Sequence, residues 1–373
     1  MKSGLSLTAD ERTALSAVWN LADAHARQAL TAKENDLVES LPSIFAVAQQ
    51  ADYFELELAS ATAFATALGQ QLPKSRPIAV YASSIAMMVV ARLARSIKAS
   101  VQLTCPTFDN IHALLVAEGV AVVPRPADSA GGAHLDPNCA VVLEVSPNNP
   151  TGSVIARDQL SNLARACKES SRILVLDQSF KGQVEEATAF DHYEVLDDSG
   201  ASYVVIEDTG KLWPSLDLKV AFIVCSADLL EALEDIVDDV LLNVSPFLLE
   251  MVRRFSELSI RDSWESVRST VGTNRALLRE LVGSSELPLS VTYPSSRVSV
   301  EVVSLWPSID SNWRDHLESR GVAVLDAGKF YWDPALRESS RPMMRVSLAR
   351  DPQYFDAAAG ALFDALKVEW ASS

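Results

Sequence analysis

A lysine that closes an apolar run is the residue best placed for covalent chemistry. Lys211 ends the peptide Val205-Ile206-Glu207-Asp208-Thr209-Gly210-Lys211, in which β-forming residues lead into a glycine. This pattern predicts a sheet strand that ends shortly before the lysine. An amine held at such a strand end, partly removed from water, has a lowered pKa and becomes a nucleophile toward an aldehyde. Lys211 is therefore the first candidate catalytic residue.

Two serines and an asparagine also follow predicted strands, where ligands bind in open parallel sheets. Ser83 and Ser84 precede a predicted helix, so their hydroxyls and the helix N-terminus could hold a phosphate. An ordinary N-cap serine explains the same residues equally well. Asn149 stands in Ser146-Pro147-Asn148-Asn149-Pro150-Thr151-Gly152, which also has the composition of a simple turn.

A carboxylate ends another apolar run. Asp177 follows Ile173–Leu176, and a carboxylate buried at a strand end is costly unless it has a partner. A protonated pyridine nitrogen is one such partner, because the charged ring then acts as an electron sink. A helix N-cap or an ordinary ion pair would explain Asp177 if it stood alone.

The elements that must position these residues form an α/β pattern. Short apolar runs alternate with helical stretches, which predicts a mostly parallel seven-stranded sheet covered by helices on both faces. The expected strands are Ile78–Ala82, Val101–Thr104, Val120–Pro124, Val141–Val145, Ile173–Leu176, Tyr203–Ile206 and Val220–Cys225.

The pattern changes after Ser226 toward a smaller α+β domain. A long helical region is expected from about Pro246 to Leu281, with further helices from Asp310 and at the C-terminus. The expected strands of this part are Leu289–Tyr293, Arg297–Trp306, Val322–Leu325 and Met344–Leu348. We expect a helical N-terminal segment (1–45) that contributes to the site, a large domain (46–250) and a small domain (251–373). Within the N-terminal segment, a capping-box pattern from Thr8 to Glu11 predicts a helix that runs to about Leu30.

Composition limits the classes of partner. The 373 residues are 48% hydrophobic, ample for a large core, and the formal net charge of −17 argues against nucleic acid. The sequence has neither an apolar run that could span a bilayer nor the pattern of a signal peptide. We therefore expect a cytoplasmic protein without a membrane partner. The scattered cysteines suit reduced thiols and fit no metal-binding spacing: Cys105, Cys139, Cys167 and Cys225.

In order and spacing, these motifs resemble the class I/II aminotransferases, which have the type I fold of enzymes dependent on pyridoxal 5′-phosphate (PLP). The resemblance implies that Lys211 carries the cofactor and that Asp177 pairs with its ring nitrogen. It also implies that Asn149 bonds the ring hydroxyl and that Arg345 binds the substrate carboxylate, for which a guanidinium fork is well suited. An ordinary surface arginine on a strand is the alternative for Arg345. The remaining implied cofactor contacts are stacking by Phe108 and phosphate binding by Ser83, Ser84 and Lys219.

The chain departs from that family pattern in three ways: at Phe180, at Asp208 and in the N-terminal segment Asn20–Leu30. Phe180 stands where these transaminases usually place a tyrosine, and Ser179 could partly substitute for it. Asp208 replaces the usual phosphate-binding hydroxyl, and a phosphate dianion would repel its carboxylate. Asp208 must therefore point elsewhere or meet a cation.

Four segments look like the PLP-dependent arginine oxidases/hydroxylases of antibiotic biosynthesis: Asn20–Leu30, Pro106–Ile111, Asp191–Leu196 and Ile206–Pro214. Members of that group convert L-arginine and dioxygen to 4-hydroxy-2-ketoarginine and 2-ketoarginine, releasing ammonia and hydrogen peroxide. The resemblance implies that Asp208 and Glu11 face the substrate guanidinium and that His25 acts beside the substrate side chain as proton shuttle or water ligand. Glu11 could instead be occupied in its capping box, and His25 could be structural. Asp23 would enter the site only if the predicted helix had ended there.

Three other readings stay open. The chain could be a true aminotransferase, an arginine desaturase of the same oxidase group that forms a 3,4-dehydro product, or a silent PLP-fold binding protein. The last is disfavoured while Lys211, Asp177 and Arg345 are all present. Neither a flavin fingerprint nor a metal-ligand cluster is visible, so PLP would be the sole redox partner. We also expect a homodimer, because type I sites are usually completed at a subunit interface.

Overall fold

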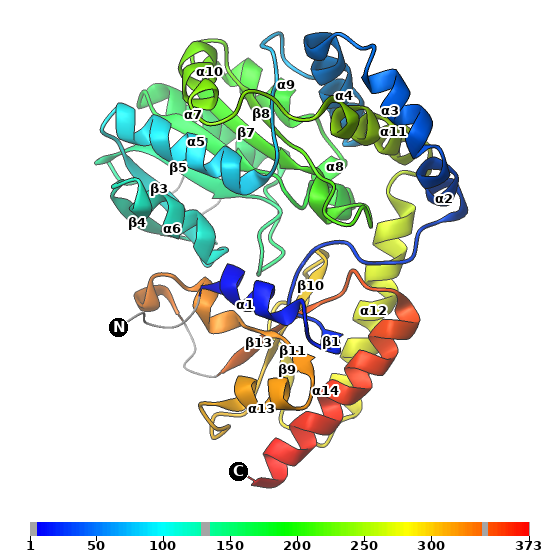
Figure 1. Ribbon diagram of the computed structural model, residues 1–373. Coiled ribbons are helices and arrows are strands. Elements are labelled where there is room, and N and C mark those ends of the chain that lie inside the picture. Colours follow the sequence, from blue (N-terminus) through cyan, green and yellow to red (C-terminus); the bar gives the residue numbers. More distant parts are fainter. Residues whose placement is uncertain (1–5, 128–134, 338–341, 373) are drawn as a thin grey trace.

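A seven-stranded sheet organises the larger part of the molecule (Figure 1). The computed structural model describes residues 6–127, 135–337 and 342–372. The strand β8 runs antiparallel to both neighbours and the other pairs are parallel, so the predicted mostly parallel α/β sheet is confirmed. In spatial order the strands are β2 (Ile78–Val80), β8 (Ala221–Cys225), β7 (Ser202–Asp208), β6 (Ile173–Asp177), β5 (Cys139–Val145), β3 (Ser100–Cys105) and β4 (Val122–Pro126). They lie where the sequence predicted them, with ends that differ by a residue or two.

Each face of this sheet has its own apolar core, which explains why the strands read as unbroken apolar runs. Val175 and Val204 pack in one core, and their neighbours Leu174 and Val205 pack in the other. The first core contains residues of α5 (Ser83–Ser96), α6 (Asp109–Ala117) and α10 (Leu230–Asp238). The second contains residues of α4 (Tyr53–Ala67), α7 (Arg157–Glu169), α9 (His192–Ser199) and α11 (Pro246–Asp262).

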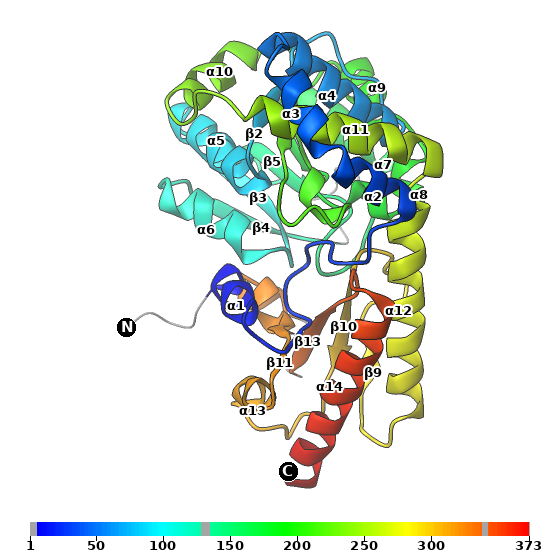
Figure 2. The same cartoon turned by 45° about the vertical axis from the view of Figure 1, so that its right-hand side comes forward.

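The smaller part is built on an antiparallel sheet (Figure 2). Its strands are, in order, β12 (Leu325–Asp326), β13 (Met343–Ser347), β10 (Val300–Ser304) and β9 (Ser290–Val291). The helices α12 (Glu265–Ser284), α13 (Trp313–Ser319) and α14 (Pro352–Ser372) complete this part. The predicted continuous helical region is broken, because Ser263 and Trp264 adopt left-handed φ values of 54° and 62° between α11 and α12.

The N-terminal segment differs from the prediction. The helix α1 spans only Leu7–Ala14, and no helix follows it to Leu30. Instead β1 (Trp19–Asn20) pairs in parallel with β11 (Val322–Ala323), and the chain then continues as a loop. The Asn20 side chain accepts hydrogen bonds from the backbone N–H groups of Ala22 (3.0 Å) and Asp23 (3.4 Å). Such local bonds favour a turn over a helix, so the prediction of a helix around His25 was wrong.

The predicted capping box of α1 was also wrong. The N-cap is Ser6, whose side chain accepts from the N–H of Ala9, two residues earlier than the expected Thr8. Glu11 therefore lies inside the helix and is not held as a box glutamate. A capping box does occur further along, at Thr31, where α2 (Ala32–Glu39) begins.

Both views place α1 between the two parts of the molecule (Figures 1 and 2). It contacts β12 of the small sheet and α6 of the large part, and the N–H of Leu7 donates to Asp109 Oδ2 at 2.9 Å. The boundaries at 45 and 250 stay predictions; α11, which begins near the second boundary, packs on α4 and α3 (Leu41–Ala48). The remaining elements are α8 (Glu185–Thr188) and short 3₁₀ turns at Lys181–Gln183, Thr209–Lys211, Ala327–Phe330 and Pro334–Leu336.

The cysteines and the apolar character of the helices also bear on the expectations from the sequence. The four cysteines are buried and unpaired, as reduced thiols would be. Among the described residues, no helix combines the length and the apolar character needed to cross a bilayer.

Candidate active site

A cavity of about 170 Å³ lies at the carboxyl ends of the parallel strands. The end of β7 brings Asp208 to it, the end of β6 brings Asp177, and the N-terminus of α5 brings Ser83 and Ser84. Of the residues predicted for the site, all but Arg345 line it: Glu11, His25, Ser83, Ser84, Phe108, Asn149, Asp177, Ser179, Asp208, Lys211 and Lys219. The sheet and the N-terminal segment therefore gather one site from distant parts of the chain.

Lys211 sits in a tight turn directly after β7. The N–H of Gly210 donates to Asp208 Oδ1 at 2.7 Å, and the Gln183 side chain donates to the Lys211 carbonyl at 2.7 Å. Burial lowers the pKa of the Lys211 amine, while the carboxylates of Glu11 and Asp208 partly oppose that shift. The amine is thus nearer to its nucleophilic, neutral form than a lysine in water.

Asp177 is buried at the end of β6 and lines the cavity. The N–H and the hydroxyl of Ser179 both donate to its Oδ1, at 2.9 and 2.6 Å. Burial raises the pKa of Asp177, and the hydrogen bonds from Ser179 oppose this rise. A cation against the carboxylate would stabilise its ionised form further. Ser179 therefore orients Asp177 toward the cavity.

Asn149 reaches the cavity from a loop that its neighbour holds in place. The Asn148 amide donates to the Pro106 carbonyl at 3.1 Å, and its oxygen accepts from the N–H of Thr151 at 3.2 Å. Gly152 has a φ of 72° and lies against Ser296 so closely that a side chain would collide with it. Asn149 is buried, and its Oδ1 has no hydrogen-bond partner among the described residues. A polar group of the cavity is thus left for a ligand.

The N-terminus of α5, Lys211 and Lys219 bring positive charge to one end of the cavity, beside the carboxylate of Asp208. Helix N-termini attract anions because their first N–H groups lack partners within the helix. Ser83 and Ser84 begin α5, and Lys219 lines the same cavity. This end therefore has the features of a phosphate site.

Asp208 is buried at the same end of the cavity. Its Oδ2 accepts from the Ser83 hydroxyl at 2.6 Å, and its Oδ1 accepts from Gly210. Burial alone would raise the pKa of Asp208, but the charges of Lys211 and Lys219 and these hydrogen bonds outweigh it, so the pKa is lowered. Asp208 therefore lies near two cations, Lys211 and Lys219, which was one of the two possibilities expected from the sequence. Whether it also faces a substrate guanidinium stays a prediction.

Arg345 lies behind the cavity wall rather than on it. It belongs to β13, is fully buried, and its Nη2 contacts Glu11 Oε1 at 3.0 Å and the Ala22 carbonyl. The Nε and Nη1 atoms of Arg345 have no hydrogen-bond partner among the described residues. The alternative of a surface arginine is thus excluded, and a buried guanidinium retains donors for a carboxylate.

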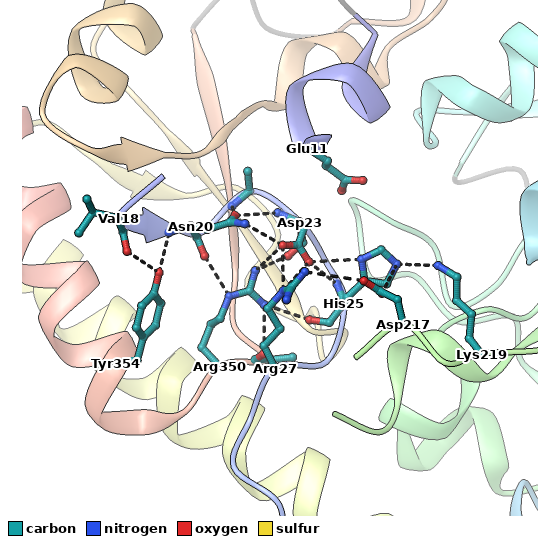
Figure 3. A network of polar contacts seen from close by, with 12 residues as sticks. Glu11, Val18, Asn20, Asp23, His25, Arg27, Asp217, Lys219, Arg350 and Tyr354 are labelled. Atoms are coloured by element: carbon teal, nitrogen blue, oxygen red, sulfur yellow. Dashed lines mark hydrogen bonds and ion pairs between the residues drawn. The ribbon is translucent and has the colours of Figure 1, made fainter. Parts of the chain in front are cut away.

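His25 is fixed between two carboxylates and a lysine (Figure 3). Asp23 Oδ1 lies 3.3 Å from its Nδ1, while Nε2 lies 2.9 Å from Lys219 Nζ and 3.4 Å from Asp217 Oδ1. The charge of Lys211, burial and the charge of Lys219 lower the pKa of His25, and Asp23 and Asp217 partly oppose this. The ring is therefore held in its neutral form near pH 7.

Asp23 ties the His25 loop to the small part of the molecule (Figure 3). It is buried, and its Oδ2 lies 3.2 Å from Arg27 Nε and 3.4 Å from Arg350 Nη2. Arg350 also donates to the backbone carbonyls of Asn20 (2.9 Å), Asp23 (2.6 Å) and His25 (3.0 Å). The predicted helix has ended before Asp23, but Asp23 does not line the cavity and contacts it through His25.

Arg350 and Asp217 were not predicted from the sequence. Each contacts the His25 loop from a segment far away in the chain, and neither belongs to a motif. Thr107, Asn110 and Met87 also line the cavity. The first two stand in the recognised segment Pro106–Ile111, which was the available signal for them.

These residues suit PLP. An amine with a lowered pKa, a buried carboxylate, an asparagine with an unpaired oxygen and a positive helix end share one cavity. Within the described ranges, no three His, Cys, Asp or Glu side chains are grouped so as to hold a metal ion.

Comparison with known proteins gives the family. Residues 78–362 match the model of aminotransferase class I and II. A solved structure of MppP soaked with the product 2-ketoarginine is 35% identical, covers 93% of this chain and 99% of that chain, and has a TM-score of 0.87. Aspartate aminotransferase from Thermus thermophilus, with maleate, is 17% identical over 97% of both chains with a TM-score of 0.78, which shows the same fold.

The similarity to curated relatives is shorter. Histidinol-phosphate aminotransferase of Caldicellulosiruptor saccharolyticus is 22% identical over 153 residues, which span 41% of this chain and 40% of that relative. The family match, by contrast, covers most of the chain. The chain therefore belongs to the class I and II aminotransferases, adopts their type I fold and has PLP as its cofactor.

Proposed function

We propose that this protein oxidises L-arginine with dioxygen to 4-hydroxy-2-ketoarginine and 2-ketoarginine, releasing ammonia and hydrogen peroxide. One observation carries the proposal: the cavity that holds Lys211 and Asp177 is also lined by Glu11, His25 and Asp208. Two carboxylates suit a guanidinium side chain, which offers five donors. The similarity to MppP, whose structure was soaked with its product 2-ketoarginine, supports the same substrate.

Each cofactor contact has a proposed residue. PLP, when bound, supplies an electron sink for negative charge at the substrate Cα. Asp177 accepts a hydrogen bond from the ring nitrogen, Asn149 bonds the ring hydroxyl, and Phe108 packs on the ring. Ser83, Ser84 and Lys219 hold the phosphate, and Ser179 keeps Asp177 oriented. Lys211 would hold the cofactor, and its amine would accept the proton from the substrate Cα.

Arg345 and Glu11 exchange partners in this proposal. Arg345 binds the substrate carboxylate, for which its buried Nε and Nη1 atoms are free among the described residues. The arriving carboxylate competes with Glu11, which now contacts Arg345 Nη2 at 3.0 Å. Glu11 is then released toward the substrate guanidinium, where Asp208 provides the second carboxylate. Binding at one end of the arginine is thereby coupled to binding at the other.

His25 acts on the substrate side chain. Its lowered pKa leaves a neutral imidazole that can accept a proton near pH 7. We assign it to the orientation of a water at Cγ and to the removal of that water's proton. Asp23, 3.3 Å from the Nδ1 atom, holds the ring for this task.

The decisive experiment follows oxygen, ammonia and peroxide together. Purified PLP-loaded protein is incubated with L-arginine, and products are identified by mass. We expect oxygen uptake, with a further dioxygen consumed for each hydroxylated product. L-citrulline, a neutral analogue of similar shape, is the matched control and should react far more slowly. Amino transfer to an added keto acid without oxygen uptake would overturn the proposal in favour of an aminotransferase.

Product mass separates the remaining alternative. An arginine desaturase of the same group would give a 3,4-dehydro product that lacks the added hydroxyl oxygen. A cytoplasmic location, a homodimer and a role in antibiotic biosynthesis complete the proposal. The homodimer is tested by the molar mass in solution, which should be twice the 40.4 kDa of one chain.

A further inference from the structure

Lys219 spans the distance between the phosphate end of the cavity and His25. Its stem runs across Gly210: a Cβ atom there would lie 2.5 Å from Lys219 Cδ and 3.3 Å from Lys219 Cβ. Contacts that close do not occur, so the path of the Lys219 stem depends on a glycine at position 210. Along this path the ammonium reaches His25 Nε2 at 2.9 Å. The backbone thus sets which groups Lys219 can touch.

The contact with Lys219 occupies the one basic nitrogen of His25. Asp23, beside Nδ1 at 3.3 Å, can only accept, whereas Lys219 is a donor and lies closer to Nε2 (2.9 Å) than the carboxylate of Asp217 does (3.4 Å). The hydrogen-bond network therefore assigns the ring proton of neutral His25 to Nδ1. Nε2 then carries the lone pair and accepts from the Lys219 ammonium. A histidine in this arrangement has no free lone pair for a water or a substrate proton. Lys219 must therefore move before His25 can act as a base.

The same ammonium also belongs to the phosphate end. Lys219 lines the cavity with Ser83 and Asp208, and its charge lowers the pKa of Asp208. A phosphate at the N-terminus of α5 would be a stronger partner for an ammonium than a neutral imidazole, because both are fully charged. An anion at this end therefore competes with His25 Nε2 for the Lys219 ammonium, and the charged partner is the stronger of the two.

We propose that Lys219 is a positioning residue that links anion binding to His25: a phosphate group bound at the N-terminus of α5 draws the Lys219 ammonium from His25 Nε2 and opens that nitrogen to the cavity. This inference rests on the proposed function, which assigns the phosphate of PLP to this end. It adds that His25 becomes a usable base only when the anion is in place. The protein without cofactor is then held in an inactive arrangement of its own residues.

Phosphate binding should change the pKa of His25 in a direction that can be measured. A phosphate dianion offsets the charge of Lys219, so the pKa of His25 rises when the anion binds. The charged groups around the ring all contribute to its pKa. They come from the N-terminal loop, the turn at Lys211, the loop that follows it and the segment just before α14: Asp23, Arg27, Lys211, Asp217, Lys219 and Arg350. Of these, Lys219 is the group that contacts the imidazole and also lines the phosphate end.

The test uses the cofactor-free protein and inorganic phosphate, so it needs no turnover. The protein carries isotope-labelled histidine, and the His25 signal is assigned with a His25→Gln variant and followed by NMR against pH. Phosphate binding is monitored independently by calorimetry. We expect the His25 titration midpoint to rise by about one pH unit on phosphate binding, since neighbouring charges shift a pKa by that order. An unchanged midpoint while phosphate binds would overturn the link between Lys219 and His25.

Two variants separate the link from a general disturbance. In Lys219→Gln, the midpoint should be raised before any phosphate is added, and phosphate should not raise it further. In Gly210→Ala, which displaces the Lys219 stem but keeps its charge, the midpoint should also start higher. Lys74→Gln, at an exposed lysine, is the control and should match the wild type. A Lys219→Gln midpoint equal to that of the wild type would refute the proposal.

Oxygen uptake and the His25 titration together distinguish failure of the proposed function from failure of the link between Lys219 and His25. If L-arginine caused no oxygen uptake but phosphate still raised the His25 titration midpoint, the oxidase reaction would be refuted. The link between Lys219 and His25 would then be retained. If phosphate did not bind to the cofactor-free protein at all, the link and the phosphate assignment would fall together.

Discussion

Glu11 Oε1 lies 3.0 Å from Arg345 Nη2, so the helix α1 closes on the buried guanidinium of the small sheet. The contact joins the N-terminal segment to β13 across the face where the two parts of the molecule meet. It also neutralises an arginine that is fully buried. The contact shields the charge of Arg345. Under the proposed function, Glu11 would also bind the guanidinium once a substrate carboxylate takes its place at Arg345.

Replacing Glu11 by glutamine separates these roles. We expect the KM for L-arginine to rise roughly tenfold or more, because a hydrogen bond to a charged group contributes about 1.5–3 kcal/mol. Binding of L-norleucine, which lacks a guanidinium, should be unchanged or tighter, because Arg345 has lost a competing carboxylate. Steady-state kinetics and equilibrium binding measure the two effects. Glu39→Gln, at an exposed position on α2, is the control. An equal loss for both ligands would mean that Glu11 is only structural.

Asp208→Asn tests the electrostatic role of the acid before Lys211. The negative charge of Asp208 raises the pKa of Lys211 against the effect of burial, so its removal should lower that pKa. We expect a decrease on the order of one unit, the size typical of a close charge. The rate at which the cofactor-free protein attaches PLP, measured against pH, reports the neutral amine. Asp198→Asn, which is exposed, should leave the profile unchanged. A profile that moved to higher pH would contradict the assignment.

The parts of this site that follow from local chemistry were predictable. Lys211, Asp177 and Asn149 each end or follow an apolar strand, and the sheet brings strand ends together by its topology. The fold class and the strands were predicted for the same reason, since each strand is buried on both faces and reads as one apolar run.

The loop around His25 could not be predicted in this way. Residues 20–30 have a composition that suits a helix, but β1 pairs with β11, and Asn20 bonds the backbone of Ala22 and Asp23. The partners of the loop, Asp217 and Arg350, come from segments about 190 and 325 residues away. A long-range ion pair of this kind leaves no periodic signal in the sequence. The same holds for the contact of Lys219 with His25.

Lys211 lines the cavity, whereas Lys181, a second buried lysine, does not. Burial lowers the pKa of Lys181 to about 7, so that lysine too has a neutral amine available near neutral pH. Lys181 does not line the cavity, and its Nζ donates to Gln178 Oε1 at 3.0 Å. We therefore expect PLP followed by borohydride to modify Lys211, as located by peptide mass mapping. In Lys211→Ala the label should be lost and should not move to Lys181 or Lys219. Persistent labelling of Lys219 in that variant would place the reactive amine elsewhere.

Asp23 should contribute to stability in a pH-dependent way. Burial alone would raise its pKa, but the hydrogen bond with His25 and the charges of Arg350 and Arg27 outweigh it, and the pKa lies well below its usual range. A carboxyl group with a depressed pKa in the folded state stabilises the fold above its unfolded pKa of about 3.9. This stabilisation is lost as the pH falls below that value toward the folded pKa.

The variant Asp23→Asn makes this measurable. At pH 7 we expect it to be less stable by about 3–5 kcal/mol, because removal of one partner leaves the charges of Arg27 and Arg350 without their shared carboxylate. Thermal unfolding of wild type and variant should differ most near neutral pH, and the difference should narrow below about pH 4, where the wild-type carboxylate loses its advantage. Asp36→Asn, an exposed substitution, controls for charge alone. A difference that stayed constant between pH 7 and pH 3 would show that Asp23 stabilises the loop by packing and hydrogen-bond geometry rather than by its charge.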